Sequence, residues 1–310
     1  MQSRLAFIVG AESSGKQWLW RCLSTHAEAL GLPETHAFLF GTRPEPSAAS
    51  QVRDIDFWRI VRQMNEGTSH VDDCPIEVSS GAHGEALHSG AEAFLCAVDE
   101  ERMRRLDALM HRLPTFATWD EVFGEVAETL DGLRPTLVEK SPGHVYYMQR
   151  IHSRFPAARF IGIVRDGRSV YAASIKKRKL WNLEPLDLKA AAMRWLRSTS
   201  TLLRFEAQFP SQVLVIRHED LMQQRAEKVA EVCRFLEIDS SLPLIEKLVD
   251  FNTFQSAADP CRPGEPQGID LDDTIRFENV IQEPEIAAFE SLTAPMLERL
   301  SYPVHRLQQR

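Results

Sequence analysis

A strand, a glycine-bounded loop and a helix are predicted within residues 4–30, and this segment limits the possible folds more than any other. The apolar run from Leu5 to Val9 leads to Gly10 and, after four more residues, to Gly15-Lys16. Apolar residues then recur at the spacing of one helical face. Such a loop wraps backbone N–H groups around a phosphate and points a helix N-terminus at it. The segment therefore predicts an α/β fold with a P-loop-type site for a nucleotide-like phosphate.

The residue that follows the loop lysine argues against a metal-dependent nucleotide hydrolase. Such enzymes place Ser or Thr there because the hydroxyl ligates Mg²⁺, whereas this chain has Gln17. An amide is a poor replacement for that ligand. The sequence therefore predicts a phosphate cradle without a metal site, and the alternative is an ordinary strand-to-helix turn with a chance Gly-Lys pair.

The overall composition excludes several classes of protein. The net charge of −8 argues against non-specific nucleic-acid binding, so an anion site has to be a local basic pocket. No apolar window reaches the roughly 18 residues that a membrane span needs, and the first strand begins too early for a signal peptide. The five cysteines are scattered without metal-ligand spacing. We therefore expect a cytoplasmic protein with reduced thiols and without membrane association.

Buried strands separated by helices predict a parallel sheet flanked by helices. The predicted strands after the first are a short or extended segment at 34–41 and buried runs at 136–138, 159–165 and 213–217. The predicted helices include 142–154 and a long amphipathic helix at 186–208, and a loop rich in Pro, Gly and Asp is expected at 257–273.

A helical insertion is predicted at about 42–133 within a single domain that spans residues 1–310. Its pattern is mostly helical, with a polar break at 68–90. The insertion is expected to shape the pocket of a second substrate. Its aromatic residues either line that pocket or fill a core, and these are Phe57, Trp58, Phe94, Phe116 and Trp119.

A second phosphate grip is predicted where the strand at 159–165 ends. Arg165 and Arg168 follow this strand, and parallel sheets bind ligands at the carboxyl ends of their strands. Guanidinium groups bind phosphate with planar, bidentate geometry. Solvated surface arginines would be the alternative if the first loop were not present.

Four segments, in this order, resemble the sulfotransferases that use 3′-phosphoadenosine-5′-phosphosulfate (PAPS), in particular their bacterial and carbohydrate branches. The resemblance covers most of the chain outside 42–133. The segments are Val9 to Leu19, Glu139-Lys140-Ser141-Pro142-Gly143-His144, Phe160 to Ser174, and Val213 to Leu221 with the helix that follows.

The resemblance implies a set of cofactor contacts. The 5′-phosphosulfate loop would comprise Gly10, Ser13, Ser14, Gly15, Lys16, Gln17 and Trp18. The 3′-phosphate would be held by Arg165, by Ser169 or Ser174, and by Arg262 and Gly264. The chain departs from the family pattern at Ser13, which replaces Arg or Lys, and at Lys16, which replaces Thr. Ser174 falls nine residues after Arg165 rather than eight, which leaves the serine open.

The resemblance also implies the reaction, in which PAPS gives a sulfuryl group to an acceptor and leaves PAP, without a metal. Lys16 and Lys140 are the candidates for neutralising the charge that develops on the oxygens. The base is expected to be Glu34 or His36, which follow the first helix, or His144.

Three functions remain open at this point. The first is a sulfotransferase that acts on a hydroxyl or amine of a small-molecule or carbohydrate acceptor, with the oligomeric state unassigned. The second is a P-loop kinase or NTPase, for which Asp166 is the only candidate metal ligand at a strand end. The third is a catalytically inactive relative that binds a nucleotide.

Overall fold

The structure is a computed structural model, and it describes residues 3–38, 56–65, 94, 96–116, 118–141, 143–180, 182, 184, 186–254 and 276–304. No helix among these residues is long and apolar enough to cross a membrane.

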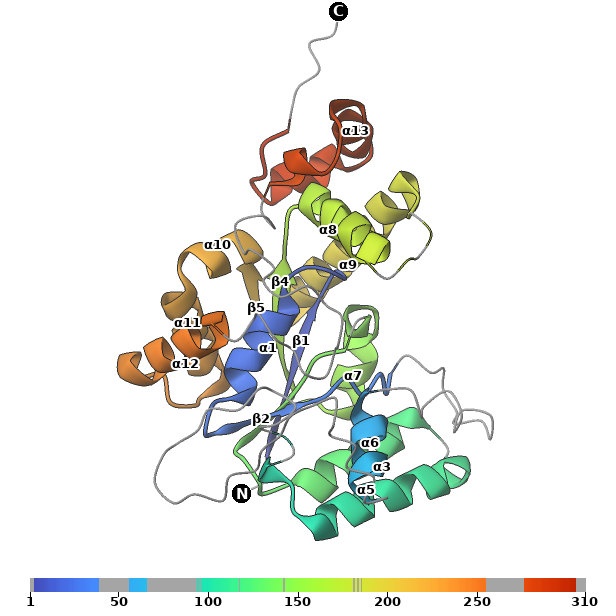
Figure 1. The fold of residues 1–310 in the computed structure, drawn as a ribbon, viewed down its shortest axis with the longest axis vertical. Helices are drawn as coiled ribbons and strands as arrows, with labels where there is room; N and C mark the ends of the chain where they lie inside the picture. Colours follow the sequence, from blue (N-terminus) through green and yellow to red (C-terminus); the bar gives the residue numbers. More distant parts are fainter. Residues whose placement is uncertain are drawn as a thin grey trace, which may run out of the picture.

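A five-stranded sheet forms the centre of the fold, in the order β2-β3-β1-β4-β5 (Figure 1). The strands are β1 (Arg4–Gly10), β2 (Ala29–Leu32), β3 (Thr136–Glu139), β4 (Arg159–Val164) and β5 (Val213–Arg217). Every neighbouring pair is parallel. All carboxyl ends therefore lie at one edge of the sheet, which is where open α/β sheets bind ligands. The predicted fold class, an α/β fold with a parallel sheet flanked by helices, is confirmed.

Helices cover both faces of the sheet, and β1 is therefore buried on both sides. Phe7 and Val9 belong to one hydrophobic cluster, whereas Ala6 and Ile8 belong to the other. This alternation follows from the two-residue period of a strand. Figure 1 shows α1, α11 and α12 on one side of the sheet and α7 and α9 on the other.

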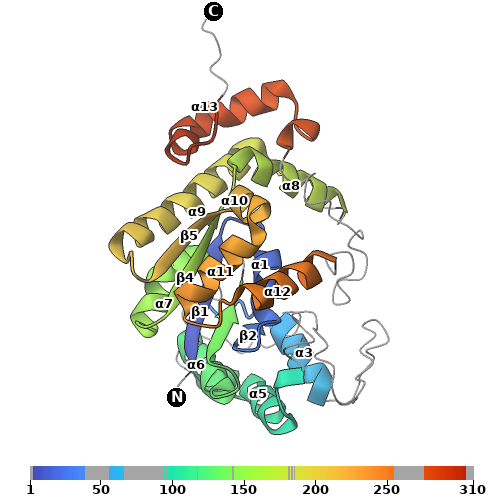
Figure 2. The ribbon, with the colours of Figure 1, turned by 90° about the vertical axis from the view of Figure 1, so that its left-hand side faces the viewer.

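The helices of the α1 face are α1 (Lys16–Ser24), α10 (His218–Gln223), α11 (Arg225–Leu236) and α12 (Leu242–Phe254). The opposite side contains α7 (Met148–Arg154), which follows the 3₁₀ turn η3 (His144–Tyr147), together with α8 (Gly167–Leu180) and α9 (Leu188–Gln208). The predicted helix at 142–154 is thus a 3₁₀ turn that continues into a short helix. At the carboxyl-terminal end of the described chain, η5 (Phe277–Asn279) precedes α13 (Glu283–Arg299), which packs on α8 and α9 (Figure 2).

The second strand lies upstream of its predicted position. Residues 34–38 form no strand, and β2 is Ala29–Leu32. The apolar residues of the predicted first helix continue at helical spacing to Ala27, so the sequence shows no sign of a strand that begins at Ala29. In the structure, α1 ends at Ser24. Gly31 makes the strand possible, because a Cβ there would lie 1.7 Å from Ser24 Oγ. Residues 39–41 lie outside the described part of the chain.

The structure describes helices within residues 42–133, where the sequence predicts a helical insertion. These are α3 (Asp56–Asn65), α5 (Glu100–Arg112), η2 (Leu113–Thr115) and α6 (Trp119–Leu130), which lie together beside the sheet (Figure 1). The aromatic residues of this segment fill the core, and all five are at most 8% exposed: Phe57, Trp58, Phe94, Phe116 and Trp119. The loop predicted at 257–273 lies outside the described residues.

Candidate functional site

The loop after β1 is shaped by residues with left-handed backbone angles. Gly10, Ser13 and Gly15 have φ values of 143°, 60° and 89°. A Cβ on Gly10 would lie 2.3 Å from the carbonyl oxygen of Ile163 on β4, so only glycine fits this position. The loop turns back on itself and ends at Gly15, the N-cap of α1. The first N–H groups of α1 have no partner within the helix, which makes this end suited to an anion.

Lys16 folds its side chain back into this loop. Its ammonium group lies 3.2 Å from the carbonyl oxygen of Gly10 and also donates to that of Ala11. The residue is only 6% exposed. Burial, followed by the charge of Lys140, lowers the pKa of Lys16 to about 7. A bound anion would reverse this effect, because it would compensate the buried charge.

A second lysine connects β3 with the loop. Lys140 Nζ donates to Gln17 Oε1 at 2.5 Å and to a carboxylate oxygen of Glu34. Lys140 is therefore close to both Lys16 and Glu34, as their mutual effects on the pKa also indicate. The amide of Gln17 thus accepts a hydrogen bond from a cation of the protein itself.

Glu34 is held between Lys140 and His36. Its other carboxylate oxygen lies 3.2 Å from His36 Nε2. Burial alone would raise the pKa of Glu34, but His36 and Lys140 outweigh burial and lower this pKa well below its usual range. The carboxylate is therefore ionised, and it can accept a proton readily only after a cation leaves it.

His144, the other candidate base, lies in the core. It is fully buried, and its Nδ1 lies 2.7 Å from Glu139 Oε2. Its ring contacts Phe7 and Phe38 edge to face. Burial alone would raise the pKa of Glu139, but the charge of His144, with hydrogen bonds that include one from Ser141, lowers it.

Arg165 lies at the end of β4 and contacts the loop. Its Nη1 donates to the carbonyl oxygen of Ser13 at 2.8 Å, and its own carbonyl oxygen accepts from Trp195 Nε1 at 3.0 Å. The residue is 4% exposed, and burial lowers its pKa despite the opposing charges of Glu219 and Asp166. The structure thus brings Arg165 next to the loop.

His218 is a site residue that the sequence analysis did not select. It follows β5 directly and is 4% exposed, and its two ring nitrogens have no hydrogen-bond partner among the described residues. A Cβ on Gly15 would lie 2.2 Å from its Nδ1. Burial, followed by the charge of Arg165, lowers the pKa of His218 to about 3, so the imidazole is neutral. Its position after a strand, like that of Arg165, was the signal that could have identified it.

Arg168, which the sequence places beside Arg165 as a candidate phosphate ligand, is bonded to acidic side chains of the protein. It is 1% exposed and donates to both carboxylate oxygens of Asp166 and to Glu290 on α13. Its guanidinium carbon also lies 4.4 Å from the ring centroid of Phe277. Arg168 therefore joins α8 to the carboxyl-terminal segment, and it occupies the one acid that the kinase alternative could use.

The remaining predicted residues lie in different environments. Ser14 is buried in the loop, 3.4 Å from Lys16 Nζ, and Trp18 is buried on α1. Ser169 is buried in the first turn of α8. The Ser174 hydroxyl donates to the Val170 carbonyl of its own helix at 2.9 Å. Arg262 and Gly264 lie outside the described residues.

The geometry favours the binding of a polyanion at the carboxyl edge of the sheet. Lys16, Lys140 and Arg165 meet there with the N-terminus of α1, and the carboxylate of Glu34 accepts from Lys140. Within the described part of the chain, no group of three or more His, Cys, Asp or Glu side chains could hold a metal ion.

Comparison with known proteins shows which family this arrangement resembles. A model described as "Sulfotransferase family" matches residues 6–241. Two curated proteins described as "Putative protein-tyrosine sulfotransferase" are similar over 157 residues, at 22% identity for Caenorhabditis briggsae and 23% for Caenorhabditis elegans. The matches cover 43% of this chain, and they span 56% and 61% of those relatives.

Solved structures share the fold. The sulfotransferase domain from the Synechococcus PCC 7002 olefin synthase has a TM-score of 0.61 at 18% identity, covering 98% of this chain and 97% of that domain. The sulfotransferase domain from the curacin biosynthetic pathway has a TM-score of 0.58 at 19% identity, covering 97% and 99%. The STF9 sulfotransferase from Mycobacterium avium has a TM-score of 0.51 at 13% identity, covering 97% and 78%.

Proposed function

The chain belongs to the sulfotransferase family, and we propose that it moves a sulfuryl group from PAPS to a hydroxyl or amine of a small-molecule or carbohydrate acceptor, without a metal ion. The observation that carries this proposal is the position of Lys140, which bonds to the loop residue Gln17 and to the carboxylate of Glu34. A cation and a base thus meet beside a phosphate loop, and sulfuryl transfer needs both.

The residues of the site fit the two anionic ends of PAPS. The left-handed loop and the N-terminus of α1 form a cradle for the 5′-phosphosulfate, with Lys16 inside it. Arg165 lies at the next strand end and would hold the 3′-phosphate. His218 has a neutral imidazole without a partner among the described residues, so it can donate a hydrogen bond to the bound nucleotide. Ser169, in the first turn of α8, is better placed than Ser174, whose hydroxyl serves its own helix.

PAPS supplies an activated sulfuryl group, and the protein supplies charge and a proton acceptor. The acceptor oxygen or nitrogen attacks sulfur, the bond between sulfur and the phosphate oxygen breaks, and PAP leaves with that electron pair. Lys16 and Lys140 stabilise the negative charge on the oxygens around sulfur. Glu34 takes the acceptor's proton, and such a base contributes on the order of a hundred- to ten-thousand-fold.

Binding of the cofactor also activates Glu34 in this scheme. In the free protein, Lys140 and His36 keep the pKa of Glu34 low, so the carboxylate is a weak base. When the ammonium of Lys140 binds the sulfonate, Glu34 loses part of this stabilisation and its pKa rises. His144 has no such access to an acceptor, because it is fully buried beside Glu139.

A thermal-shift experiment tests the proposal. PAP should stabilise the protein in excess EDTA, because a ligand that binds only the folded state raises the melting temperature. ATP with Mg²⁺ is the matched control for the kinase alternative, and it should stabilise the protein less. Stabilisation by ATP with Mg²⁺ but not by PAP would contradict the proposal. Binding of PAP without any detectable sulfuryl transfer from PAPS would instead favour the inactive relative.

A further inference from the structure

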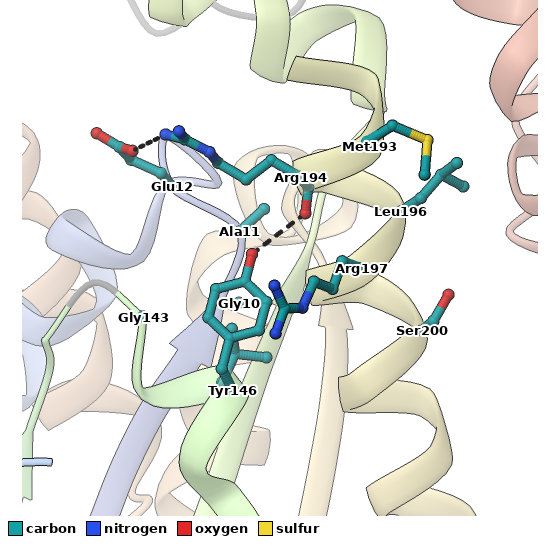
Figure 3. Close-up of a pocket in the computed structure, with 11 residues that line it drawn as sticks. Gly10, Ala11, Glu12, Gly143, Tyr146, Met193, Arg194, Leu196, Arg197 and Ser200 are labelled. Carbon is teal, nitrogen blue, oxygen red and sulfur yellow. Dashed lines mark hydrogen bonds and ion pairs between the residues drawn. The ribbon is translucent and has the colours of Figure 1, made fainter. Parts of the chain in front are cut away.

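A pocket of about 720 Å³ lies beside the phosphate loop. Its walls come from the loop at Gly10 to Glu12, from η3 and the glycine before it, and from one side of α9 (Figure 3). Lys16, Lys140 and Arg165 do not line this pocket. It is therefore distinct from the contacts that Lys16, Lys140 and Arg165 would make with the cofactor, although Gly10 to Glu12 of the loop form part of its wall.

Two arginines on one face of α9 give this pocket its charge. Arg194 and Arg197 are one helical turn apart, and both line the pocket (Figure 3). The guanidinium carbon of Arg197 lies 5.1 Å from the ring centroid of Tyr146. This cation–π contact orients the guanidinium without neutralising it. Among the described residues, no carboxylate lies within ion-pair distance of Arg197.

Glu12 offsets only part of this charge. One of its carboxylate oxygens lies 3.6 Å from Arg194 Nη1, and the other lies 3.6 Å from Lys177 Nζ on α8. Glu12 is thus shared between Arg194 and Lys177, and Arg197 adds a further positive charge to the lining of the pocket. The surplus is local, because the whole chain carries a net charge of −8. Such a surplus attracts an anion.

The rest of the lining is suited to the body of an organic molecule. Val145, Met193 and Leu196 add apolar surface, and Met193 is 52% exposed. Tyr146 adds a phenol whose pKa is raised by burial, so it stays neutral. Ligand pockets commonly combine apolar walls with a few oriented polar groups.

We propose that this pocket binds the acceptor through an oxyanion on the acceptor itself, so that the substrate class is hydroxylated organic acids or phosphates rather than neutral alcohols. The inference rests on the proposed function, because the pocket opens beside the loop that would hold the sulfonate. Arg197 is the principal ligand of the oxyanion, and Arg194 assists when Glu12 releases it. A carboxylate and a phosphate present the same chemistry to a guanidinium pair.

Calorimetric titration with matched probes tests this assignment. The probes are 4-hydroxyphenylacetate against its methyl ester, and glycerol 3-phosphate against glycerol, each titrated with and without saturating PAP. At least one anionic probe should bind about tenfold or more tightly than its neutral counterpart. The two pairs also separate a carboxylate from a phosphate as the preferred group.

Three variants locate the effect. Arg197→Gln should reduce the preference for the anionic probe by about tenfold or more, whereas Arg204→Gln, the same charge change two turns along α9 and outside the pocket, should preserve it. Glu12→Gln should strengthen binding of the anionic probe, because it frees Arg194 and removes a negative charge. An opposite change in Glu12→Gln, a preference that survives Arg197→Gln, or equal affinities for anionic and neutral probes would overturn the assignment.

A titration of each protein with PAP separates the two proposals. If PAP binds and no anionic probe binds below about 10 mM, the pocket assignment is wrong and the proposed function stands. If PAP fails to bind the unmodified protein, the proposed function is wrong, and the titrations without PAP still decide whether the pocket selects oxyanions.

Discussion

Lys140 and Glu34 form a buried ion pair at the carboxyl edge of the sheet, with side chains 8% and 14% exposed. The pair joins the end of β3 to the segment after β2, and Lys140 also reaches Gln17 at the start of α1. In our account this pair is the resting form of the site. The cation stabilises the carboxylate until a sulfonate replaces that carboxylate as its partner.

The first prediction concerns the base. Glu34→Gln should lower kcat by on the order of a hundredfold or more, because the amide cannot accept the proton of the acceptor. The affinity for PAP, measured by calorimetry, should change little or increase, since Lys140 is released from its carboxylate. A variant that keeps kcat near the unmodified value would show that Glu34 is not the base.

The second prediction concerns proton uptake by Lys16. The pKa of Lys16 is about 7 in the folded protein and 10.5 in a free lysine, so the folded protein binds fewer protons between these pH values. At pH 8, about nine-tenths of Lys16 is neutral. Binding of PAP should raise this pKa, so Lys16 should take up nearly one proton per protein at pH 8 and only a small fraction of a proton at pH 6.

Calorimetry in buffers of different ionisation enthalpy measures this uptake directly. Lys16→Met should abolish the uptake at pH 8 and weaken the binding of PAP. The same depressed pKa makes folding stability rise with pH between about 7 and 10.5, because the unfolded chain binds more protons in this range. Equal proton uptake in the unmodified protein and in Lys16→Met would contradict the role of Lys16.

The third prediction assigns His144 to stability rather than to catalysis. His144→Phe keeps an aromatic ring beside Phe7 and Phe38 but leaves the Glu139 carboxylate without the imidazole nitrogen that lies 2.7 Å from it. Leaving a buried polar group without one of its partners costs about 1–3 kcal/mol of unfolding free energy, and more for a charged group. The double variant His144→Phe/Glu139→Gln should recover part of this loss in denaturant unfolding. If His144→Phe is as stable as the unmodified protein but loses kcat by about a hundredfold, His144 is the base.

The fourth prediction concerns the 3′-phosphate. Arg165→Ala should greatly weaken the binding of PAP while adenosine 5′-phosphosulfate, which lacks the 3′-phosphate, binds almost as before. The control matters because Arg165 also donates to the carbonyl oxygen of Ser13 in the loop. Equal losses for both ligands would mean that Arg165 acts only by supporting the loop.

The sequence contained enough information for the sheet and the loop. Gly10 and Gly15 marked the loop because its backbone angles need glycine, and β3, β4 and β5 were visible as apolar runs. The strand β2 was misplaced because a strand of four residues shows little periodicity in the sequence. The need for glycine at position 31 is also visible only in the structure, where a side chain there would clash with Ser24.

The roles of charged residues were harder to predict, because they depend on partners that are far away in sequence. Arg168 looked like a phosphate ligand until α13 placed Glu290 beside it. His144 follows a sequence motif, but its burial beside Glu139, Phe7 and Phe38 is visible only in the folded chain. His218 was missed although its position directly after β5 was a signal, because its close packing against Gly15 arises only in the folded chain.

The transfer reaction itself tests the central claim most directly. The protein is incubated in excess EDTA with sulfur-labelled PAPS and a panel of hydroxyl and amine acceptors, and in parallel with Mg²⁺ and ATP labelled in its γ-phosphate. Our account predicts labelled sulfate ester or sulfamate at an undiminished rate in EDTA, with no phosphoryl transfer or ATP hydrolysis above background. Phosphoryl transfer that requires Mg²⁺ and is lost in Lys16→Ala, without any transfer from PAPS, would contradict it.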